Sequence, residues 1–566
     1  MRLRIPRVPL RAGLLLTLVA AAACSDRELV APTGPGLFNT EEAPDSGEHT
    51  IWPSDGGETA SLNGSASFSI SSAAAPGPRI RIGVVPAAGS VALGSAGDYV
   101  LRDKGTGVDL MSGSGGTVTV TSVGVSVSYY RLQVMCGSVA AVNARKAAAE
   151  AEGYPTLTEF VPAANCTRLY LGQLPSTSTF TQRTVLRNEL IGKGLAGTDS
   201  FYRLLAVGGQ QMYRITRGTT VVETVNPVVL TSSGGIVTIA GASYRDVAEA
   251  RRNSAGTMAG INELGMEPYL YGVVPRELGP VAYPEVEAQK AQAVAARTYA
   301  ISGLGKRAID GYDLLATTTD QVYGGYAAEH PVSSAAVDAT AGLVATHEGR
   351  LIGTLYSSTS GGFTANNEEV FNSAPIAYLR GTPDAERGQA YDHVPTLDVF
   401  RNHANPTSLR AAREGDFESD WARYHRWVFE WTMPEITQVI SAYAGQPVGK
   451  VLAINVTERG PSGRVLTIEY VTEAGTFTDT KDRIRSSLKF INAGGTPTNL
   501  LSTLFYIEPV TDSKTKATVG FKAYGGGFGH GVGLSQTGAV GMAQKGHTFD
   551  QILKHYYRGI ELVARY

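Results

Sequence analysis

The sequence predicts a multidomain α+β protein, with a β-rich core that carries short helices and a small repeated strand–helix module. The length of 566 residues exceeds what one hydrophobic core usually organises, so several domains are expected. β-Branched runs such as RIRIGVV, which starts at Arg79, are separated by glycine clusters and are typical of strands. An alanine-rich stretch such as residues 140–153 predicts a helix.

The charge composition disfavours one class of partner. Charged residues make up 18% of the chain, and the formal net charge is −2. Binding to nucleic acid draws on a basic excess that releases counterions from phosphates, and this chain has no such excess. We therefore expect no nucleic-acid partner. The 66 glycines suit a turn-rich exported protein.

The amino terminus has the pattern of an export signal. Four arginines precede an apolar run, residues 12–23, which is too short to span a bilayer. We expect residues 1–23 to be a signal peptide. Cys24 follows small residues and resembles a bacterial lipoprotein cleavage site, so lipidation of Cys24 would anchor the protein to a membrane, facing the periplasm or cell wall. Ala21 stands where leucine is usual, and ordinary signal-peptidase cleavage remains the alternative.

Residues 24–78 are rich in Gly, Ser, Ala and Pro, with little apolar periodicity, and predict a disordered tether. Two cysteines follow it, Cys136 and Cys166. In an exported protein such a pair is readily oxidised, so we expect a disulfide. Two buried thiols are the alternative.

Residues 79–127 and 207–256 have the same β-rich texture, and residues 128–206 differ from both. In this middle segment a strand and a helix occur twice, and each copy opens on an Arg-Leu strand. The repeat resembles a SPOR domain, a small module that binds glycan strands stripped of their stem peptides. An unrelated α+β insert is the alternative.

Two distant segments carry the most specific pattern. One is YLYGVVPRELGPVAYPEVEAQKAQAVAARTYA, residues 269–300, and the other is YGGGFGHGVGLSQTGA, residues 524–539. Together they resemble the SpoIID/LytB family (stage II sporulation protein D and amidase enhancers), whose substrate is peptidoglycan. The resemblance covers residues 257–566 together with the β segments before them.

Glu277 is the candidate catalytic residue. It follows residues 269–274, which we interpret as an apolar strand-like run, and it is bracketed by Val274 and Leu278. Partial burial raises the pKa of a carboxyl group, as general acid catalysis near neutral pH requires. The resemblance implies that Glu277 is the acid of a lytic transglycosylase. The alternative is a surface glutamate at the start of a helix.

The helix predicted from Pro284 carries Lys290, Gln292 and Arg297. Many alanines allow close packing of this helix, so its cations need partners. We assign all three side chains to substrate binding, with a structural ion pair as the alternative.

The segment LYSSTSGGFT, residues 355–364, resembles a family motif near which some members hold zinc with histidine and cysteine. Ser357 and Ser360 stand there in this chain. Hydroxyls are poor zinc ligands, so we expect no metal and no cofactor. We assign Ser360 to substrate binding. A nucleophilic role is weak because no GxSxG elbow surrounds it.

The glycine-rich loop lacks both GxGxxG and a P-loop, so it does not predict phosphate binding. Its glycines let the backbone approach a ligand closely. His530, Ser535 and Gln536 are the expected donors to sugar groups, and a packed structural histidine is the alternative. Clustered Trp421, Trp427 and Trp431 predict a satellite core or a sugar-stacking platform.

These resemblances imply a peptidoglycan-remodelling lipoprotein that cleaves the bond between N-acetylmuramic acid and N-acetylglucosamine in denuded glycan strands. A second hypothesis is a non-catalytic scaffold that enhances an N-acetylmuramoyl-L-alanine amidase. A third is a hydrolytic muramidase, which needs a second carboxylate. The candidates for it are Asp320, Glu368 and Asp384.

Overall fold

The computed structural model describes residues 77–124, 127–161, 164, 166–207, 212–386, 396–404, 416–418 and 421–566. The predicted signal peptide, Cys24 and the predicted tether up to residue 76 lie outside the described residues. Within the described residues, no helix combines the length and apolar character needed to cross a bilayer.

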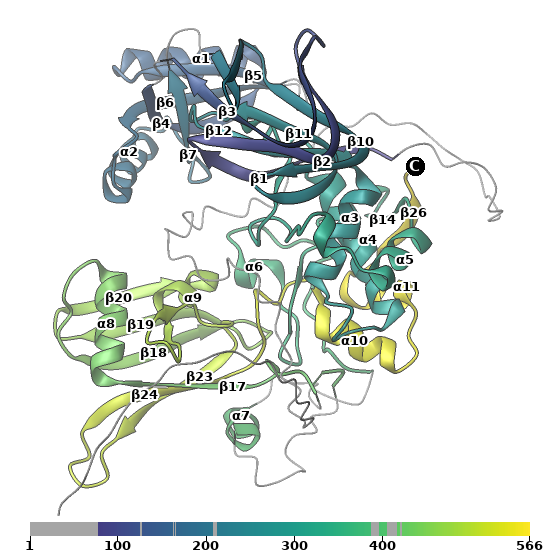
Figure 1. Ribbon diagram of the computed structural model, residues 1–566. Helices are drawn as coiled ribbons and strands as arrows, with labels where there is room; N and C mark the ends of the chain where they lie inside the picture. The colour runs from purple at the N-terminus through teal and green to yellow at the C-terminus, as the bar shows by residue number, and fades with distance from the viewer. Residues whose placement is uncertain are drawn as a thin grey trace, which may run out of the picture. The chain divides into compact units, whose positions relative to one another are not determined.

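One nine-stranded sheet organises the first part of the described chain (Figure 1), in the order β13-β1-β12-β11-β10-β2-β3-β8-β9. Its strands are β1 Arg79–Ala88, β2 Ser90–Asp103, β3 Asp109–Val123, β8 Met212–Arg217, β9 Thr220–Thr224, β10 Val228–Ile239, β11 Ala242–Arg252, β12 Met258–Gly265 and β13 Leu314–Leu315. β3 pairs directly with β8, with Val120 opposite Ile215. The sheet therefore continues across the segment between these two strands.

That segment forms its own four-stranded sheet, in the order β5-β6-β4-β7. Its elements are β4 Val127–Gly137, α1 Val139–Ala151, β5 Thr156–Val161, β6 Cys166–Pro175, α2 Phe180–Gly192 and β7 Phe201–Val207. This βαββαβ arrangement contains the predicted strand–helix repeat and adds a strand after each helix. Cys136 and Cys166 form a disulfide between β4 and β6, with 5.5 Å between their Cα atoms. Val142 of α1 and Leu190 of α2 join Leu132 and Leu169 of the sheet in one apolar core.

The prediction of a strand over residues 269–274 is wrong. These residues belong to helix α3, Met266–Glu277, which contains Pro275 in its last turn. Proline removes one helical hydrogen bond there, but α3 buries Tyr269 and Val273 against the nine-stranded sheet. This apolar burial outweighs the local preference of the sequence.

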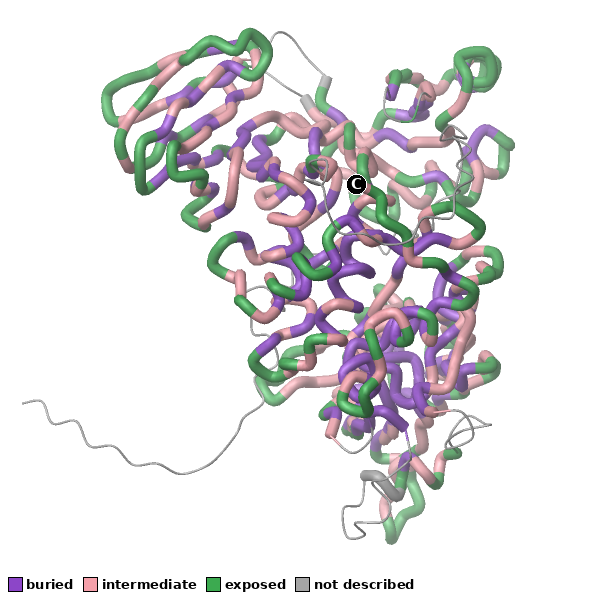
Figure 2. Tube along the Cα trace, turned by 90° about the vertical axis from the view of Figure 1, so that its right-hand side faces the viewer, coloured by how far each residue is buried: buried purple, intermediate pink, exposed green. Residues whose placement is uncertain are grey.

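Helix α4, Val286–Ser302, begins two residues later than predicted and lies between two cores. Ala293 and Ala296 pack toward the nine-stranded sheet, whereas Ala291 and Ala295 pack toward the carboxy-terminal helices. The small side chains let α4 contact four helices around it (Figure 1): α3, α5 Pro331–Ala339, α10 Gln536–Gln544 and α11 Phe549–Tyr556. Figure 2 shows buried residues in the interior of helices and strands and exposed residues at many turns.

Two small sheets complete this region. One contains β14 Leu343–His347, β15 Arg350–Leu351 and β26 Glu561–Ala564, and the other pairs β16 Tyr356–Ser357 with β25 Leu534–Ser535 in parallel. The second sheet joins the 355–364 motif to the glycine-rich segment 524–539, which lies far away in the sequence. α6, Asn367–Val370, follows β16 in the chain.

α7, Leu397–Ala404, precedes a separate core that is formed between residues 427 and 525. The elements of this core are β17 Trp427–Thr432, α8 Met433–Ala444, β18 Val451–Arg459, β19 Val465–Thr472, β20 Gly475–Thr480, α9 Ile484–Ser487, β21 Phe490–Ile491, β22 Pro497–Thr498, β23 Phe505–Thr511 and β24 Thr518–Gly525. Trp427 and Trp431 are 8% and 1% exposed and belong to this core, as the satellite-core alternative predicted for them.

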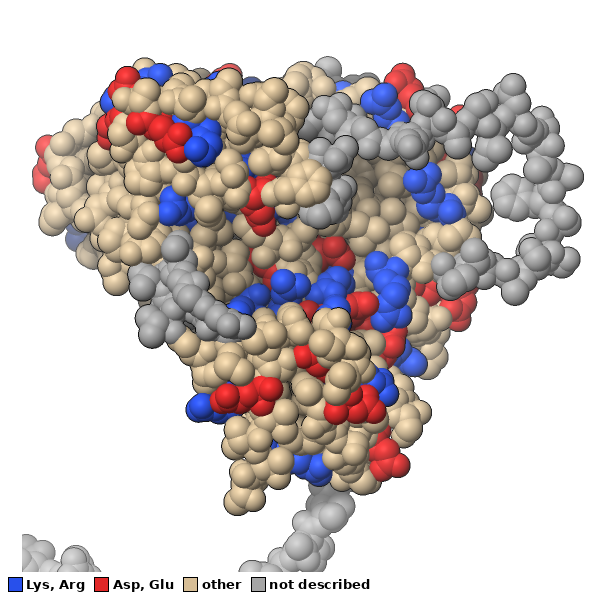
Figure 3. Space-filling view, turned by 90° about the horizontal axis from the view of Figure 1, so that it is seen from above, with Lys and Arg blue, Asp and Glu red and all other residues tan. Residues whose placement is uncertain are grey.

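Charged side chains of opposite sign lie close together on the face drawn in Figure 3. On the nine-stranded sheet, Arg81 pairs with Glu249 at 2.7 Å and with Glu263 at 2.8 Å. Lys104 pairs with the same two carboxylates. These cations are therefore neutralised by neighbours within the chain.

Candidate active site

Glu277 is the last residue of α3, and its side chain is partly buried. Its Oε1 accepts a hydrogen bond from the backbone amide of Val322 at 2.6 Å. Burial raises the pKa of Glu277 to about 7, against the opposing effects of Val322, of hydrogen bonds from Tyr356 and Gln536, and of the charge of Arg276. Near neutral pH this carboxyl group can therefore both donate and accept a proton.

Tyr356 reaches Glu277 from β16, and a buried glutamine fixes its orientation. Nε2 of Gln321 donates to the Tyr356 hydroxyl at 2.9 Å and to the carbonyl of Ala296 at 3.2 Å. Oε1 of the same glutamine accepts from the Tyr269 hydroxyl at 3.1 Å. Gln321 is fully buried and uses both ends of its amide in hydrogen bonds. It therefore holds the Tyr356 hydroxyl in one position beside Glu277.

Gln536 approaches Glu277 from the first turn of α10, and it also touches Gln292. Its Nε2 lies 3.2 Å from Oε1 of Gln292. Nε2 of Gln292 is buried and has no hydrogen-bond partner among the described residues. A buried amide without a partner is costly, so this group is a candidate donor to a ligand at the site.

Arg297 does not reach Glu277 in this structure. It is fully buried and forms two hydrogen bonds with Glu267, at 2.8 and 2.6 Å. It also donates to the carbonyls of Leu343 at 3.1 Å and Val337 at 3.2 Å. The structural ion pair that the sequence left as an alternative is therefore the arrangement seen here. The role in substrate binding stays a prediction.

Two other predicted binding residues, Lys290 and His530, contact side chains or backbone groups other than Glu277. Lys290 is paired with Glu287 on the same helix at 2.7 Å. The ring of His530 packs on Phe371, with 5.7 Å between centroids, and its Nδ1 accepts from the amide of Val532 at 3.0 Å. The five largest effects on the pKa of Glu277 come from burial and from other residues.

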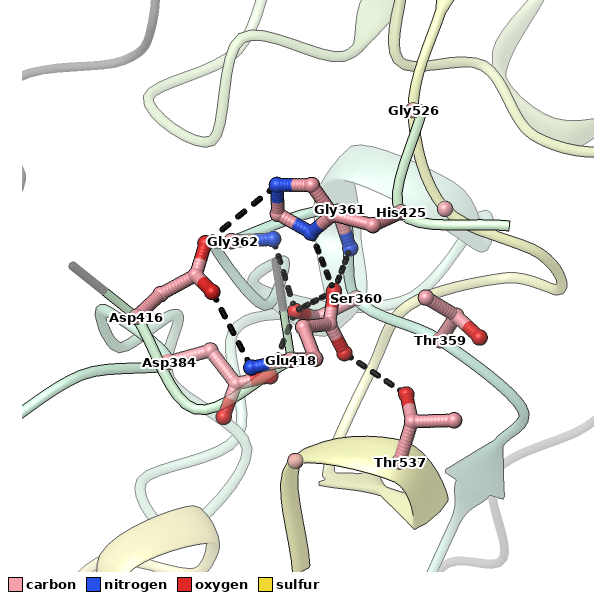
Figure 4. A network of polar contacts seen from close by, with 12 residues as sticks. Thr359, Ser360, Gly361, Gly362, Asp384, Asp416, Glu418, His425, Gly526 and Thr537 are labelled. Atoms are coloured by element: carbon pink, nitrogen blue, oxygen red, sulfur yellow. Dashed lines mark hydrogen bonds and ion pairs between the residues drawn. The ribbon is translucent and has the colours of Figure 1, made fainter. Parts of the chain in front are cut away.

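Ser360 lies in a buried polar network behind the site (Figure 4). Its Oγ lies 2.7 Å from Oδ2 of Asp384 and 3.2 Å from Oε1 of Glu418, so its one hydroxyl proton bonds with this pair of carboxyl groups. Nδ1 of His425 lies 3.1 Å from the same oxygen of Glu418, and Nε2 of His425 lies 3.3 Å from Asp416. Because Ser360 has no exposed surface, its hydroxyl is not presented to a ligand in this structure, and its assigned role in binding stays a prediction.

Glu418 ties this network to the residues beside Glu277. Its Oε2 accepts from Ser535 at 3.1 Å and from Thr537 at 2.7 Å, and these two residues flank Gln536. The predicted binding residue Ser535 is thus buried in the same network. The network therefore contacts the start of α10, which carries Gln536, and the turn that follows β16, the strand that carries Tyr356.

The pKa values of two carboxyl groups in the network, Asp384 and Glu418, are shifted in opposite directions. Burial and the charge of Glu418 raise the pKa of Asp384 well above its ordinary value. For Glu418, hydrogen bonds from His425 and Thr537 outweigh the effect of burial and lower the pKa. Of this pair, Asp384 therefore holds a proton more readily and Glu418 carries the charge more readily, which limits the charge buried at this point.

The residues of the 355–364 motif do not fit a zinc ion. Ser360 is engaged with Asp384 and Glu418, and the hydroxyl of Ser357 accepts from the amide of Gly531 at 3.1 Å. Zinc in proteins is bound by thiolate, imidazole or carboxylate ligands. Within the described residues, no group of three or more such side chains is arranged to hold a metal ion.

Each candidate for a second catalytic carboxylate is occupied by other groups. Asp320 pairs with Lys306 at 2.6 Å and with Arg307 at 3.2 Å. Glu368 is paired with Arg380, and Asp384 is buried in the network. In this structure each of these three carboxyl groups is therefore engaged with partners other than Glu277.

Sequence reasoning missed Tyr356, Gln321 and Glu418. Tyr356 lies in the same 355–364 motif as Ser360. Its hydroxyl group, next to the serines, could have indicated a further candidate for the site. Gln321 and Glu418 carry no local signal. Their partners lie far away in the sequence, and only the fold brings them together.

Comparison with known proteins gives two matching family models. Residues 254–347 match a model described as Stage II sporulation protein, which includes Glu277, Gln292 and Arg297. Residues 365–533 match a model described as a domain of unknown function (DUF8618). This second segment contributes Glu418 and His425 to the buried network.

Three curated proteins are similar to about half of this chain. An uncharacterized protein of Brachyspira hyodysenteriae is 30% identical over 310 residues, covering 54% of this chain and 69% of that protein. The amidase enhancer of Bacillus subtilis is 30% identical over 311 residues, covering 52% of this chain and 40% of that protein. Stage II sporulation protein D of Bacillus amyloliquefaciens is 27% identical over 322 residues, covering 53% of this chain and 75% of that protein.

Proposed function

The chain belongs to the SpoIID/LytB family, and from this premise we propose that it is a cell-wall lytic transglycosylase with Glu277 as its acid. The substrate is the glycan strand of peptidoglycan, and the bond cleaved joins N-acetylmuramic acid to N-acetylglucosamine. The observation that carries the proposal is the raised pKa of Glu277, about 7, in a partly buried site that also holds Tyr356 and Gln536.

The reaction needs one group that gives and then takes a proton. Protonated Glu277 donates to the glycosidic oxygen, the bond from that oxygen to C1 of the muramic residue breaks, and C1 becomes electron-poor. The carboxylate then accepts the proton of the C6 hydroxyl while the C6 oxygen bonds to C1. The products are a 1,6-anhydro end and a free 4-hydroxyl, and no water is consumed. A pKa near the working pH suits both proton transfers.

The surroundings of Glu277 support this reaction over hydrolysis. A hydrolytic enzyme uses a second carboxylate to activate water or to attack the sugar. Asp320 is held by Lys306 and Arg307, and Glu368 is held by Arg380. Asp384 is buried beside Glu418. A single acid with neutral hydrogen-bonding neighbours fits the anhydro reaction.

Other parts of the chain suit the same polymer. The buried Nε2 of Gln292 would donate to an acetamido or hydroxyl oxygen of the sugar. We also propose that the βαββαβ insert is a SPOR-like module that binds denuded glycan. A lipid on Cys24 would keep the exported protein at a membrane facing the wall.

The test is mass spectrometry of denuded glycan strands after incubation with the purified protein. The wild type is expected to release peptide-free sugars with anhydro ends. The Glu277→Gln variant should release no such sugars but should still bind glycan. Anhydro products from the Glu277→Gln variant would show that another group is the acid. New reducing ends would mean that the enzyme is a hydrolase.

A second function rests on the similarity to the amidase enhancer of Bacillus subtilis. In that case the chain would bind the wall and stimulate a separate N-acetylmuramoyl-L-alanine amidase. The same digests separate the two functions, because an enhancer yields no glycan product alone and raises the release of stem peptides when the amidase is added.

A further inference from the structure

Four partly exposed aromatic residues form a cluster near the candidate active site. The rings of Tyr283 and Trp421 lie 5.7 Å apart between centroids, and those of Tyr424 and Phe528 lie 4.9 Å apart. The two pairs are joined by one turn of the chain, because Trp421 and Tyr424 stand three residues apart in it. We call these four residues the aromatic platform.

The aromatic platform is linked to Glu277 and Tyr356 through short segments of the chain. Tyr283 lies on the connection that leaves Glu277 and leads into α4. Phe528 is paired through its backbone with Thr359, with hydrogen bonds of 2.9 and 3.1 Å. Thr359 follows Tyr356 by three residues, and Tyr356 is a hydrogen-bonding neighbour of Glu277.

Trp421 differs from the two tryptophans that follow it. Trp427 and Trp431 are buried at 8% and 1% exposure, whereas Trp421 stays partly exposed. Its Nε1 already donates to the carbonyl of Phe417 at 3.1 Å. The polar end of the indole is thus satisfied inside the protein, and what remains for a ligand is the apolar part of the ring.

We propose that the aromatic platform is a sugar-stacking subsite, which holds the pyranose rings of a glycan strand beyond the bond that Glu277 cleaves. This inference rests on the proposed function. Pyranose rings have apolar C–H faces and polar edges, which match aromatic faces whose tyrosine hydroxyls lie at the rim. The links between the platform and Glu277 favour a glycan strand as the ligand, because a glycan strand bound across the acid would extend over the neighbouring surface.

The proposal gives a role to the segment 365–533. Trp421 and Tyr424 come from this segment, whereas Tyr283 lies in the part that carries Glu277. The segment would therefore set how long a strand must be for tight binding, and the acid would act on the bond itself.

The experiment measures binding of denuded strands in a Glu277→Gln background, so that no cleavage occurs, and cleavage rates against strand length with Glu277 intact. Trp421→Ala should weaken binding about five- to tenfold, the range expected for loss of one aromatic contact. It should also slow cleavage of long strands more than that of the shortest substrate. Trp421→Phe should restore most of the binding.

Phe490→Leu is the matched control, since Phe490 is stacked on Phe429 at 4.0 Å in the separate core. Tyr424→Ala is the second platform variant, for use if Trp421→Ala fails to fold. Unchanged binding in both platform variants, with Glu277→Gln inactive, overturns the platform and leaves the proposed function standing. Absence of both glycan binding and anhydro products in the wild type overturns the two together.

Discussion

The backbone amide of Val322 donates to Oε1 of Glu277 across 2.6 Å, and this contact sets the position of the candidate acid. Val322 follows Gln321, which orients Tyr356, so one short segment places two of the groups around the carboxyl. A backbone donor is lost only on substitution by proline, which would also change the local backbone conformation. The predictions therefore change Glu277 itself, its side-chain neighbours and the packing behind them.

Glu277→Gln should make protein stability less dependent on pH. The pKa of Glu277 is about 7 in the folded protein against an ordinary value of 4.5. Since the folded pKa is the higher one, the contribution of this group is full below pH 4.5 and is lost as the pH rises through 7. At pH 8 the variant should be more stable than the wild type, by up to about 3 kcal/mol, and the two should be similar at pH 4.

Denaturant unfolding at the two pH values measures this difference. Exposed Glu561 is the control position, where glutamine should leave the comparison unchanged. A Glu277→Gln variant that is less stable than the wild type at pH 8 would contradict the raised pKa, because it would mean that the folded protein stabilises the charged form of Glu277.

Tyr356→Phe should move the pH dependence of cleavage upward. Protonated Glu277 is needed in the free enzyme, so kcat/KM of the wild type should fall above pH about 7. The hydrogen bond from Tyr356 lowers the pKa of Glu277, and its removal leaves burial less opposed. The alkaline limb should therefore shift to higher pH. A pH–rate profile that loses height but keeps its midpoint would place Tyr356 outside hydrogen-bonding contact with the acid.

Gly538→Ala should unfold or loosen the buried network. A Cβ atom at Gly538 would lie closer than 3.0 Å to the Tyr556 hydroxyl and to both carboxylate oxygens of Asp384. Both neighbours are fully buried and have little room to move. We expect a loss of about 1–3 kcal/mol in the free energy of unfolding, measured by denaturant titration.

Gly192 provides the matched control for this substitution. It also lies in a helix, and an added Cβ there meets no atom within 4 Å. Alanine at position 192 should be neutral or stabilising by up to about 1 kcal/mol. Equal effects at the two positions would show that the network tolerates the extra methyl group.

Sequence reasoning located Glu277, Gln292 and Gln536, because each lies in a long motif whose residues could be read in order. It misread residues 269–274 as a strand, since an apolar run has the same appearance in a buried helix, and the tertiary packing of α3 decides between them. It could not pair Arg297 with Glu267. That contact depends on α3 and α4 lying side by side, which no local pattern reports.

Reduction of the Cys136–Cys166 disulfide should destabilise the βαββαβ insert alone. The bond closes a loop with a sequence separation of 30 residues, and the chain-entropy model assigns about 3.5 kcal/mol to a loop of this size. The insert has its own sheet and its own apolar core, so the loss should stay within it. Amide hydrogen exchange with and without reductant should show faster exchange in residues 127–207. Faster exchange throughout α4 would contradict this localisation.

Arg297→Met should destabilise the protein strongly, because it leaves the carboxylate of Glu267 without its partner. The guanidinium is fully buried and donates to Glu267 at 2.8 and 2.6 Å, and loss of one member of such a pair costs about 3–5 kcal/mol. Replacing both residues, as Arg297→Met with Glu267→Met, should recover much of the loss, since no buried charge then remains. Unfolding free energies of the two single variants and the double variant form the cycle.

Arg297→Lys separates this role from substrate binding: a structural pair predicts a lower Tm with KM little changed. A raised KM at an unchanged Tm would instead restore Arg297 to the substrate.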